Sequence, residues 1–499
     1  MRKAPRPSLA QVAIAAFLAL VVLPRAAVPL IDGDVWWHIR AGLELLETGR
    51  VPSVDAWSIA GAGMPWTSQD WLSNVLLASL TGGAVGGAGA MGASVLFASL
   101  VVVTAALLWW ALDARGVRGW LGRVVWLSFG IIVAGPALGV RVQVVDLVLA
   151  ASVLYLLWRY LADPRRRWLI GLPVVALAWA NLHAGWVILF LLGGAVLVGE
   201  VIDRRLRPTE ATLTWRACAE LGLALAIAFA ALAVNPSGLG LYAYPIQTSL
   251  IAAHREYLAE WSPPRLTSVV GQVFWAFAIV GVGSALLLGW RRLRTADLLV
   301  LIGLTVMGAY AARFLLVAPL AASVVVIAWS RIPSPPVVSR MSRPAQSARL
   351  GAANLALIVA IAGTGIAVAA TRIAPSAQDE AIGEHMPVGA VDWIVANDPG
   401  DRVFNTYSWG GYLGMRRPDL PIYIDGRSDI YGDGPIREYA QAVLLETDPA
   451  ELFERRRIDH VLFGVGTPLA VWLDSRPEWE KTYADDLAAV WVRFGDQAP

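Results

Sequence analysis

Long apolar blocks alternate with short polar segments through the first 370 residues of the chain. Each block is about 15 to 25 residues long, which is the length a helix needs to cross about 30 Å of hydrocarbon. We predict crossings at residues 9–23, 72–112, 121–139, 143–160, 168–181, 185–201, 213–234, 269–290, 296–311, 312–330 and 350–370. The pattern therefore indicates an α-helical polytopic membrane protein with about 11 to 13 transmembrane helices.

Two of these blocks leave alternatives open. Residues 72–112 are too long for one helix and contain the glycine-rich run 82–87, so they form either one crossing with a re-entrant or interfacial helix, or three crossings. The block at 9–23 follows Arg2, Lys3 and Arg6, as in a secretory signal peptide. Because ten further blocks follow and no small-residue cleavage site is convincing, we interpret it as an uncleaved first span.

The composition excludes a single soluble domain. Hydrophobic residues make up 57% of the 499 residues, charged residues make up 16%, and the mean hydropathy is +0.58. Soluble domains carry roughly 25% charged residues. The single cysteine, Cys218, excludes a disulfide framework or a cysteine metal site within one chain. Only Lys3 and Lys481 are lysine, and we interpret the arginine-rich basic residues as compositional bias and not as a nucleic-acid surface.

The distribution of basic residues predicts the topology. With a cytoplasmic amino terminus, 21 of the 40 basic residues fall in cytoplasmic segments, 7 in the opposite loops and 12 in the tail after residue 371. Since cytoplasmic loops of membrane proteins are enriched in Lys and Arg, we expect this orientation in the cytoplasmic membrane. It places residues 31–71, residues 235–268 and the whole tail on the outer face. The proline- and serine-containing segment 332–348 becomes a cytoplasmic loop.

The tail has the composition of a soluble α/β domain. Beyond residue 371 it holds 22 acidic and 12 basic residues. Strands are predicted at 402–407, 421–425, 460–463 and 489–494, with helices near 387–396, 435–445, 448–457 and 468–475. We therefore predict two domains, a transmembrane domain at 1–370 that includes the outer loop 31–71, and a small extracytoplasmic α/β domain at 371–499.

The densest polar cluster directly follows the first span. Asp32 and Asp34 are separated by one glycine and precede Trp36 and Trp37. Two carboxylates at this spacing can approach a metal or a polar substrate group, and indoles suit the depth of lipid headgroups. The helical face periodicity indicates a helix lying flat on the membrane and ending at Gly49, with Trp36, Ile39, Leu43 and Leu46 on one face and Arg40, Glu44 and Glu47 on another. The alternative is that both aspartates only cap this helix.

This cluster, Asp34-Val-Trp-Trp-His-Ile-Arg40-Ala-Gly42 after Asp32, resembles the first outer-loop motif of GT-C glycosyltransferases. It is similar to the signature of oligosaccharyltransferase catalytic subunits, more distantly to protein mannosyltransferases, and to a bacterial branch with the same Trp-Trp-His start and the tail motifs described below. The matching sequence motifs cover about 40 residues. The arrangement of many spans followed by an outer tail domain extends the resemblance to the whole chain. It implies a GT-C-like fold and an enzyme that uses a sugar linked to polyprenyl phosphate.

The resemblance also implies roles for individual residues. Asp34, with Asp32 as its partner, is expected to act as general base on the acceptor or to hold a divalent metal, Mg or Mn. Guanidinium groups match phosphate oxygens, so the outer-face arginines are candidates for the donor phosphate, although each also fits a headgroup-snorkelling role. The donor candidates are Arg40, Arg141, Asp146, His183 and Arg313. The second Asp-x-Asp or Glu-x-Asp pair of the metal-dependent members is absent. His183 also fits a plain turn residue.

Two motifs in the tail are candidates for acceptor binding. The run from Asn405 to Leu413 carries Tyr407, Trp409 and Tyr412 around paired glycines, and distantly resembles the acceptor motif of oligosaccharyltransferases without its aspartate. The second motif contains Asp425 and Arg427. An arginine–carboxylate brace between the tail and the membrane domain explains this second motif equally well.

Two classes of function remain at this stage. The first is transfer of a sugar from a polyprenyl-phosphate donor to a lipid, glycan or protein acceptor on the outer face. The second is a non-catalytic role as a lipid-linked glycan translocase or envelope assembly protein. Membrane lipids are partners in both, and few charges lie near mid-membrane, which favours a reaction site at the outer interface over a transport path.

Overall fold

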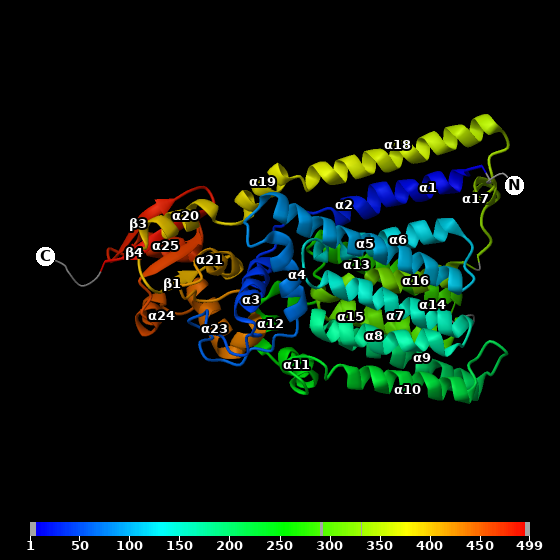
Figure 1. The fold of residues 1–499 in the computed structure, drawn as a ribbon, viewed down its shortest axis with the longest axis horizontal. Helices are drawn as coiled ribbons and strands as arrows, with labels where there is room; N and C mark the ends of the chain where they lie inside the picture. The colour runs from blue at the N-terminus through cyan, green and yellow to red at the C-terminus, as the bar shows by residue number, and fades with distance from the viewer. Residues whose placement is uncertain (1–5, 290–292, 331, 495–499) are drawn as a thin grey trace. The chain divides into compact units, whose positions relative to one another are not determined.

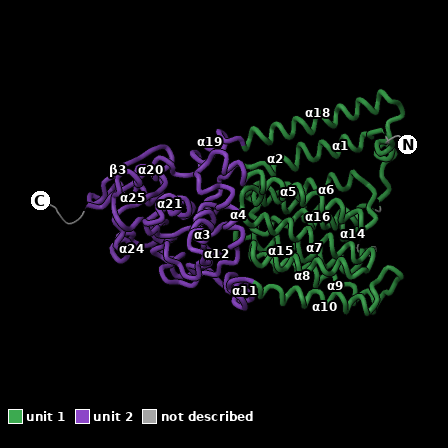
Figure 2. Tube along the Cα trace, in the orientation of Figure 1, with its two compact units in different colours: residues 1–28, 94–234, 260–373 green, residues 29–93, 235–259, 374–499 purple. Residues whose placement is uncertain are grey.

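The computed structural model describes residues 6–289, 293–330 and 332–494. Arg2, Lys3, Arg291, Arg292 and Arg331, which enter the charge argument, lie outside these residues. Internal contacts divide the chain into two compact units, which Figure 2 shows in green and purple. Unit 1 comprises residues 1–28, 94–234 and 260–373, and unit 2 comprises residues 29–93, 235–259 and 374–499.

Unit 1 consists of helices, and its long helices run side by side in Figure 1. Its elements are α1 (Leu9–Phe17), η1 (Leu18–Val22), α2 (Leu23–Ala26), most of α5 (Gly87–Ala114), α6 (Trp120–Ala134), η2 (Gly135–Ala137), α7 (Val144–Ala162), α8 (Arg166–Leu182), η3 (Ala184–Trp186), α9 (Val187–Leu206), α10 (Trp215–Ala231), α13 (Val269–Ala276), η5 (Phe277–Val282), α14 (Gly283–Gly289), α15 (Thr295–Tyr310), η6 (Ala312–Val317), α16 (Ala318–Trp329), α17 (Pro336–Met341) and α18 (Ala348–Arg372). The short helix η4 (Ala259–Trp261) lies at the sequence boundary with unit 2.

Eight helical segments in the described part of the chain are long and apolar enough to cross a membrane. They are Leu9–Ala26, Gly87–Ala114, Trp120–Ala137, Val144–Ala162, Ala184–Leu206, Val269–Leu288, Ala312–Trp329 and Ala348–Arg372. The other three predicted crossings coincide with the shorter helices α8 and α10, of 17 residues each, and α15, of 16 residues. The protein is therefore a multi-pass membrane protein, and every predicted apolar block contains a helix.

The predicted break at the glycine run is confirmed. The block at 72–112 divides into α4 (Trp71–Thr81) and α5, and α4 ends at Gly82, which adopts a left-handed conformation with φ of 61°. Since α4 has only 11 residues, it is too short to cross a bilayer as a helix. This agrees with the alternative of one crossing plus an additional helix.

Burial separates the interior helices of unit 1 from the peripheral ones. In the apolar window of α16, 78% of the residues are buried, and its small residues allow close packing against α6, where Gly130 meets Pro319. In α18 the share is 6%, and this helix packs on α1, η1 and α2. An apolar helix with so little protein contact is typical of one surrounded by lipid.

Unit 2 is mixed α/β. Its elements are α3 (Asp34–Thr48), α4, α11 (Gly240–Ser249), α12 (Ala252–Tyr257), α19 (Pro375–His385), α20 (Val388–Asn397), β1 (Val403–Asn405), η7 (Tyr407–Trp409), α21 (Gly410–Arg416), α22 (Ser428–Tyr431), α23 (Asp433–Val443), α24 (Pro449–Arg456), β2 (His460–Gly464), α25 (Pro468–Asp474), β3 (Trp479–Ala484) and β4 (Ala488–Arg493). Unit 2 contains residues 31–71, residues 235–259 and the tail from 374, which the charge pattern places on one face of the membrane, and also residues 72–93 from the block predicted to cross it. The tail thus folds together with parts of both predicted outer loops.

A four-stranded sheet forms the centre of the tail, in the order β1-β2-β4-β3. The pair β1–β2 is parallel, and the pairs β2–β4 and β3–β4 are antiparallel. Helix α20 packs on β3 and β4, and α25 packs on β2 and β3. The core beside the sheet is rich in aromatic residues, including Phe404, Tyr423, Phe453 and Trp491.

The strand predicted at 421–425 is wrong, and strand β3 was not predicted. Residues 422–424 instead pair with the outer loop and with one side chain. Ile59 N donates to Ile422 O at 2.7 Å, and Ile422 N donates to Trp57 O at 3.1 Å. The buried amide of Asn405 accepts from Tyr423 N at 2.8 Å and donates to Ile424 O at 2.8 Å. A side-chain amide thus takes the place of a neighbouring strand, because it offers one donor and one acceptor like a peptide group.

Candidate functional site

The predicted catalytic aspartates lie at the start of α3. Helix α3 begins at Asp34, and Oδ1 of Asp32 accepts a hydrogen bond from Asp34 N at 3.0 Å. This local turn supplies an acceptor for an amide that the helix leaves without an intrahelical partner. Both aspartates are partly exposed. The N-cap residue is Gly33, which Asp32 precedes, so Asp32 forms a local turn just before the helix and Asp34 lies in the first helical turn.

The first half of α3 packs inside unit 2 and does not present its apolar face to lipid as the sequence predicts, whereas the predicted end at Gly49 is confirmed. All residues from Val35 to Gly42 are buried, in contact with α4 on one side and α21 on another. The helix ends at Gly49, which is left-handed with φ of 68°. The amphipathic pattern therefore matches a helix packed inside unit 2, with Leu46 near its end 55% exposed.

The tail approaches the first turn of α3 closely. A methyl group on Gly33 would overlap the carbonyl oxygen of Ser408, and one on Gly411 would lie 2.8 Å from Gly33 O and 3.1 Å from Trp37 N. One turn further on, the rings of Trp36 and Tyr412 meet edge to face, with centroids 5.1 Å apart. Gly411 of the 405–413 motif is therefore required by backbone contact with the aspartate-bearing helix, whereas a methyl group on its neighbour Gly410 would overlap Ile424 O.

On its other side α3 is held by polar contacts with the loop and helix that follow it in unit 2. His38 Nδ1 lies 2.6 Å from Asn74 Oδ1 and 3.4 Å from Asp70 Oδ2. The His38 ring also packs against Trp37, with centroids 3.5 Å apart. The histidine of the Trp-Trp-His run thus anchors α3 on α4.

Arg427 joins the tail to the outer loop through buried ion pairs. Its Nη1 lies 3.0 Å from Asp55 Oδ1, and its Nη2 lies 2.9 Å from Asp425 Oδ2. Its guanidinium carbon is 4.4 Å from the ring centroid of Trp57 and 4.6 Å from that of Trp66, so the cation lies between two indoles. This is the brace that the sequence left open as the alternative to acceptor binding. We call it the Arg427 clamp, and it consists of Arg427, Asp425, Asp55, Trp57, Trp66 and Tyr431.

The contacts within the clamp keep Arg427 protonated and Tyr431 neutral. Burial opposes the charge of Arg427, but Asp425, Tyr431 and Asp55 outweigh it and raise the pKa of Arg427. Burial, together with Asp425, raises the pKa of Tyr431 well above its ordinary value, so its hydroxyl stays neutral and donates to Asp425 Oδ1 at 2.8 Å. All three ionised side chains have exposed fractions of 1% or less. The clamp is thus an internal structural network.

Arg40, predicted to bind donor phosphate, extends the same stack. Its guanidinium carbon is 4.2 Å from the ring centroid of Trp57, and its Nη2 donates to Pro418 O at 2.9 Å. Burial, with repulsion from Arg427, lowers the pKa of Arg40 to about 10, which leaves it protonated at neutral pH. With 8% of its surface exposed, Arg40 is committed to contacts within unit 2.

The aromatic residues proposed for acceptor binding are partly committed to packing. Tyr412 is fully buried and accepts from Arg416 Nη1 at 3.1 Å. Trp409 is 6% exposed, and its Nε1 donates to His385 O at 3.1 Å. Tyr407 is less buried, and its backbone N donates to the hydroxyl of Tyr439 at 2.8 Å. Of the three, Tyr407 keeps the most exposed surface.

In unit 1 the structure brings together Asp146 and His183. Asp146, in the first turn of α7, lies 2.7 Å from His183 Nδ1, which follows α8. The indole Nε1 of Trp179 donates to the other carboxylate oxygen at 2.6 Å. A methyl group on Gly185 would overlap this carboxylate, so η3 packs tightly against it. Arg141 lies in the turn between η2 and α7, partly exposed.

Arg313, at the start of η6, is held over an aromatic ring. Its guanidinium carbon is 4.0 Å from the ring centroid of Trp261, and its Nη1 lies 3.6 Å from Glu260 Oε1. Backbone contact between Ala312 N and Ser262 O, at 2.9 Å, fixes this arrangement. The Arg313 side chain keeps 23% of its surface exposed. Helix η6 also contacts η2 and α7. These two elements flank Arg141, and Asp146 lies in the first turn of α7.

The acidic pair at α3 offers an incomplete set of metal ligands within unit 2. Asp32 Oδ1 already accepts the amide of Asp34. No three His, Cys, Asp or Glu residues gather in a metal-binding group within the described ranges. Since Mg²⁺ and Mn²⁺ in proteins take carboxylate oxygens and water, Asp32 and Asp34 would supply two carboxylate groups to such an ion. The metal role of this pair stays a prediction from the sequence.

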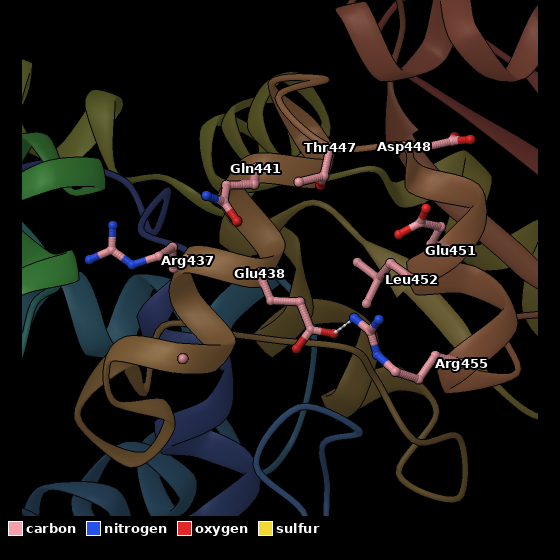
Figure 3. Close-up of a pocket in the computed structure, with 9 residues that line it drawn as sticks. Arg437, Glu438, Gln441, Thr447, Asp448, Glu451, Leu452 and Arg455 are labelled. Carbon is pink, nitrogen blue, oxygen red and sulfur yellow. Dashed lines mark hydrogen bonds and ion pairs between the residues drawn. The ribbon is translucent and has the colours of Figure 1, made fainter.

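A polar cavity of about 310 Å³ lies between α23 and α24, and neither Asp32 nor Asp34 lines it (Figure 3). Its side chains include Arg437, Glu438, Gln441 and Arg455. Arg455 lies 2.7 Å from Glu438 Oε1, and Arg456 lies 2.9 Å from Glu438 Oε2. The main charges at this cavity thus compensate one another.

Comparison with solved structures identifies the fold. The chain is similar to the archaeal oligosaccharyltransferase AglB from Archaeoglobus fulgidus, in complex with an inhibitory peptide and a dolichol-phosphate, with a TM-score of 0.57 and 11% identity over 98% of this chain and 74% of that one. It is also similar to ArnT from Cupriavidus metallidurans bound to undecaprenyl phosphate, with a TM-score of 0.52 and 14% identity over 97% of this chain and 98% of that one. The chain has a GT-C fold.

A second oligosaccharyltransferase structure from Archaeoglobus fulgidus, in complex with Zn and sulfate, matches this GT-C chain with a TM-score of 0.52 and 13% identity, over 91% of this chain and 68% of that one. No protein-family model matches the chain. No curated protein matches its sequence. The structural similarity therefore confirms the GT-C fold predicted from the aspartate motif and the span pattern. At this low sequence identity the similarity establishes the fold and nothing further.

Sequence reasoning missed Asp55, Trp57, Trp66 and Gly426 as parts of the site. The only signal was that an acidic residue and two indoles occur in the same outer loop as Asp34. Their partners lie in the tail, hundreds of residues away, and spacing along a chain does not predict such pairing. Gly426 lies between Asp425 and Arg427, and nothing in the sequence indicates its contact with Asp34.

Proposed function

We propose that this protein is a membrane glycosyltransferase that moves a sugar from a polyprenyl-phosphate donor to a lipid, glycan or protein acceptor on the outer face of the cytoplasmic membrane. The observation that carries the proposal is the position of Asp34. In a chain with a GT-C fold, this carboxylate begins the first helix after the first span and is partly exposed. The neighbours' bound dolichol-phosphate and undecaprenyl phosphate support a lipid-phosphate donor.

In the proposed reaction Asp34 is the proton acceptor. An acceptor hydroxyl or amide attacks the anomeric carbon, its proton passes to the Asp34 carboxylate, and the bond from that carbon to the phosphate oxygen breaks. The electron pair of that bond leaves with the polyprenyl phosphate. Because the acceptor attacks in a single displacement from the side opposite to the leaving phosphate, the configuration at the anomeric carbon inverts. Asp32 orients the first turn of α3 through its bond to Asp34 N.

Cationic groups of unit 1, considered within that unit alone, are our candidates for binding the donor phosphate. Arg313 suits this role because its ring contact with Trp261 pre-orients a guanidinium that is still partly exposed. Arg141 and His183 are the other candidates, and Asp146 orients the His183 ring through Nδ1. We assign Arg40, Asp425 and Arg427 to the architecture of unit 2 instead, because they are buried in mutual contacts.

The charge asymmetry supports the orientation of the proposal. Parts of both predicted outer loops and the tail fold together as unit 2, as expected if they share one side of the membrane. Acceptor binding by Tyr407, with Trp409 and Tyr412 behind it, belongs to this proposal. So does a divalent ion held by Asp32 and Asp34, through which no step of the proposed chemistry passes.

The deciding experiment uses the full chain in lipid nanodiscs. A panel of undecaprenyl-phosphate hexoses and pentoses, labelled in the sugar, is incubated with envelope membranes from cells lacking the protein. We expect label in a new glycosidic bond with the wild type and none with Asp34→Asn, while Asp34→Asn still binds undecaprenyl phosphate. Arg455→Ala, at the cavity of Figure 3, is the matched control and should transfer normally.

Full activity of Asp34→Asn would remove Asp34 as the base, and absence of transfer by the wild type with every donor of the panel would remove the enzymatic proposal. Movement of the labelled lipid across proteoliposomes, with no new glycosidic bond under any condition, would instead establish the translocase function.

A further inference from the structure

The tail places a glycine directly against the proposed base. A methyl group built on Gly426 would overlap Asp34 Oδ1, would lie 2.6 Å from Asp34 Cγ, and would lie 3.2 Å from Trp37 Nε1. The first of these contacts is closer than any real side chain makes. Only the absence of a Cβ at residue 426 lets the tail backbone lie beside the Asp34 carboxylate in its present rotamer.

The position of Gly426 is fixed from both sides. Its two neighbours, Asp425 and Arg427, are buried members of the Arg427 clamp. Its own carbonyl accepts from Ser428 N at 2.8 Å. The preceding residues are bonded to the outer loop and to Asn405. The backbone at Gly426 is therefore held by an ion-pair network and by paired backbone, and has little freedom to retreat from Asp34.

We propose that Gly426 is a positioning residue that fixes the rotamer of Asp34, and that the Arg427 clamp transmits its rigidity to the base through this glycine. The inference rests on the proposed function for its catalytic meaning, but the contact itself is testable without a substrate. Through this contact the tail takes part in preorganising the carboxylate that accepts the proton.

The first test is a double-mutant cycle on stability, using the full chain in detergent. Gly426→Ala should lower the melting temperature in the wild-type background. In the Asp34→Ala background, where the overlapping oxygens are gone, the same change should lower it by less than about half as much, because contacting residues couple. Gly383→Ala is the control, since a methyl group there meets nothing within 4 Å, and it should have the same small effect in both backgrounds.

An equal cost of Gly426→Ala in both backgrounds overturns the contact and with it the proposal. If Gly426→Ala alone fails to fold, recovery of folding by Asp34→Ala supports the proposal, and failure of both variants overturns it.

The second test measures sugar transfer from the donor identified in the nanodisc assay. A displaced catalytic group can lower the rate about 100-fold. We expect Gly426→Ala to reduce kcat by at least about tenfold, with KM for the donor within about twofold of wild type, because binding is left intact. Gly383→Ala should match wild type in both constants. A normal kcat in Gly426→Ala overturns the positioning role.

The two proposals fail in different ways. Absence of transfer by the wild type removes the proposed function, and full activity of Asp34→Asn removes Asp34 as its base, whatever the stability cycle shows. An inactive Asp34→Asn together with a fully active Gly426→Ala removes only the positioning role.

Discussion

Arg427 and Asp55 are 372 positions apart in the sequence and form a buried ion pair, with 3.0 Å between Nη1 and Oδ1. One partner belongs to the tail and the other to the loop that follows the first span. Two indoles cover the guanidinium, and Asp425 pairs with its other edge. The loop that carries Asp34 and the tail are therefore one folded body, and neither is expected to keep its conformation when the pair is broken.

We predict that Asp55→Ala destabilises unit 2 by about 3 kcal/mol or more, because removing one partner leaves a buried charge incompletely paired. The free energy of unfolding can be followed by tryptophan fluorescence in urea, since Trp57 and Trp66 lie against Arg427. As a control, Glu256→Ala breaks the more exposed ion pair with Arg437 and should cost less than about 1 kcal/mol. Equal costs for the two variants would show that the clamp does not hold unit 2 together.

We predict that protonation of Asp459 at low pH lowers the stability of the tail. Burial raises the pKa of this carboxyl, but hydrogen bonds from His460 and from the backbone N–H groups of Arg402 and Asp401 outweigh it and leave the pKa below its ordinary value. Its stabilising effect is therefore present above the ordinary aspartate pKa of about 3.9 and is lost as the pH falls through the lowered value. Melting temperatures of the full chain between about pH 5 and pH 3 should fall less steeply in Asp459→Asn than in wild type.

Glu480→Gln, an exposed change on β3, is the matched control for this pH series. It should leave the slope of melting temperature against pH unchanged. A wild-type slope in Asp459→Asn would contradict the assignment.

Substitutions at Asp32 should separate its local bond from its charge. Asparagine forms the same turn with the amide two residues on, so Asp32→Asn should change stability by less than about 0.5 kcal/mol, whereas Asp32→Ala should cost about 1 kcal/mol. Thermal melting of the full chain checks this order. If sugar transfer falls in Asp32→Asn at unchanged stability, the charge of Asp32 contributes to the reaction, and if transfer is retained, the residue only shapes the first turn of α3.

Arg313 and Glu260 should have opposite effects on the lipid phosphate. Removing the guanidinium with Arg313→Ala should weaken binding of undecaprenyl phosphate about tenfold, which corresponds to about 1.4 kcal/mol. Glu260→Gln removes a carboxylate 3.6 Å from Arg313 that competes for the guanidinium, so it should leave binding unchanged or strengthen it. Binding of undecaprenyl phosphate to nanodisc-embedded protein, measured by native mass spectrometry, tests both variants. Weaker binding in Glu260→Gln would contradict a phosphate role for Arg313.

The sequence by itself determined the membrane architecture. Bilayer thickness sets the length of an apolar block, so all predicted blocks contain helices, and the break at Gly82 follows from its backbone freedom. It also determined the bounds of α3 and most helices of the tail, because caps and periodicity are local signals. The aspartate motif then indicated the GT-C fold that the structural comparison confirms.

Only the tertiary structure decided which charged residues serve the fold. The sequence suggested a catalytic or substrate-binding role for each of Arg427, Arg40 and Asp34. In the structure the two arginines are instead stacked on Trp57 inside unit 2. Residues 421–425 looked like a strand and instead lie between Asn405 and the outer loop. The importance of Gly426 follows from its contact with the Asp34 carboxylate, nearly 400 positions earlier in the sequence. Burial and pairing arise from contacts between segments distant in the chain, and local pattern carries no record of those contacts.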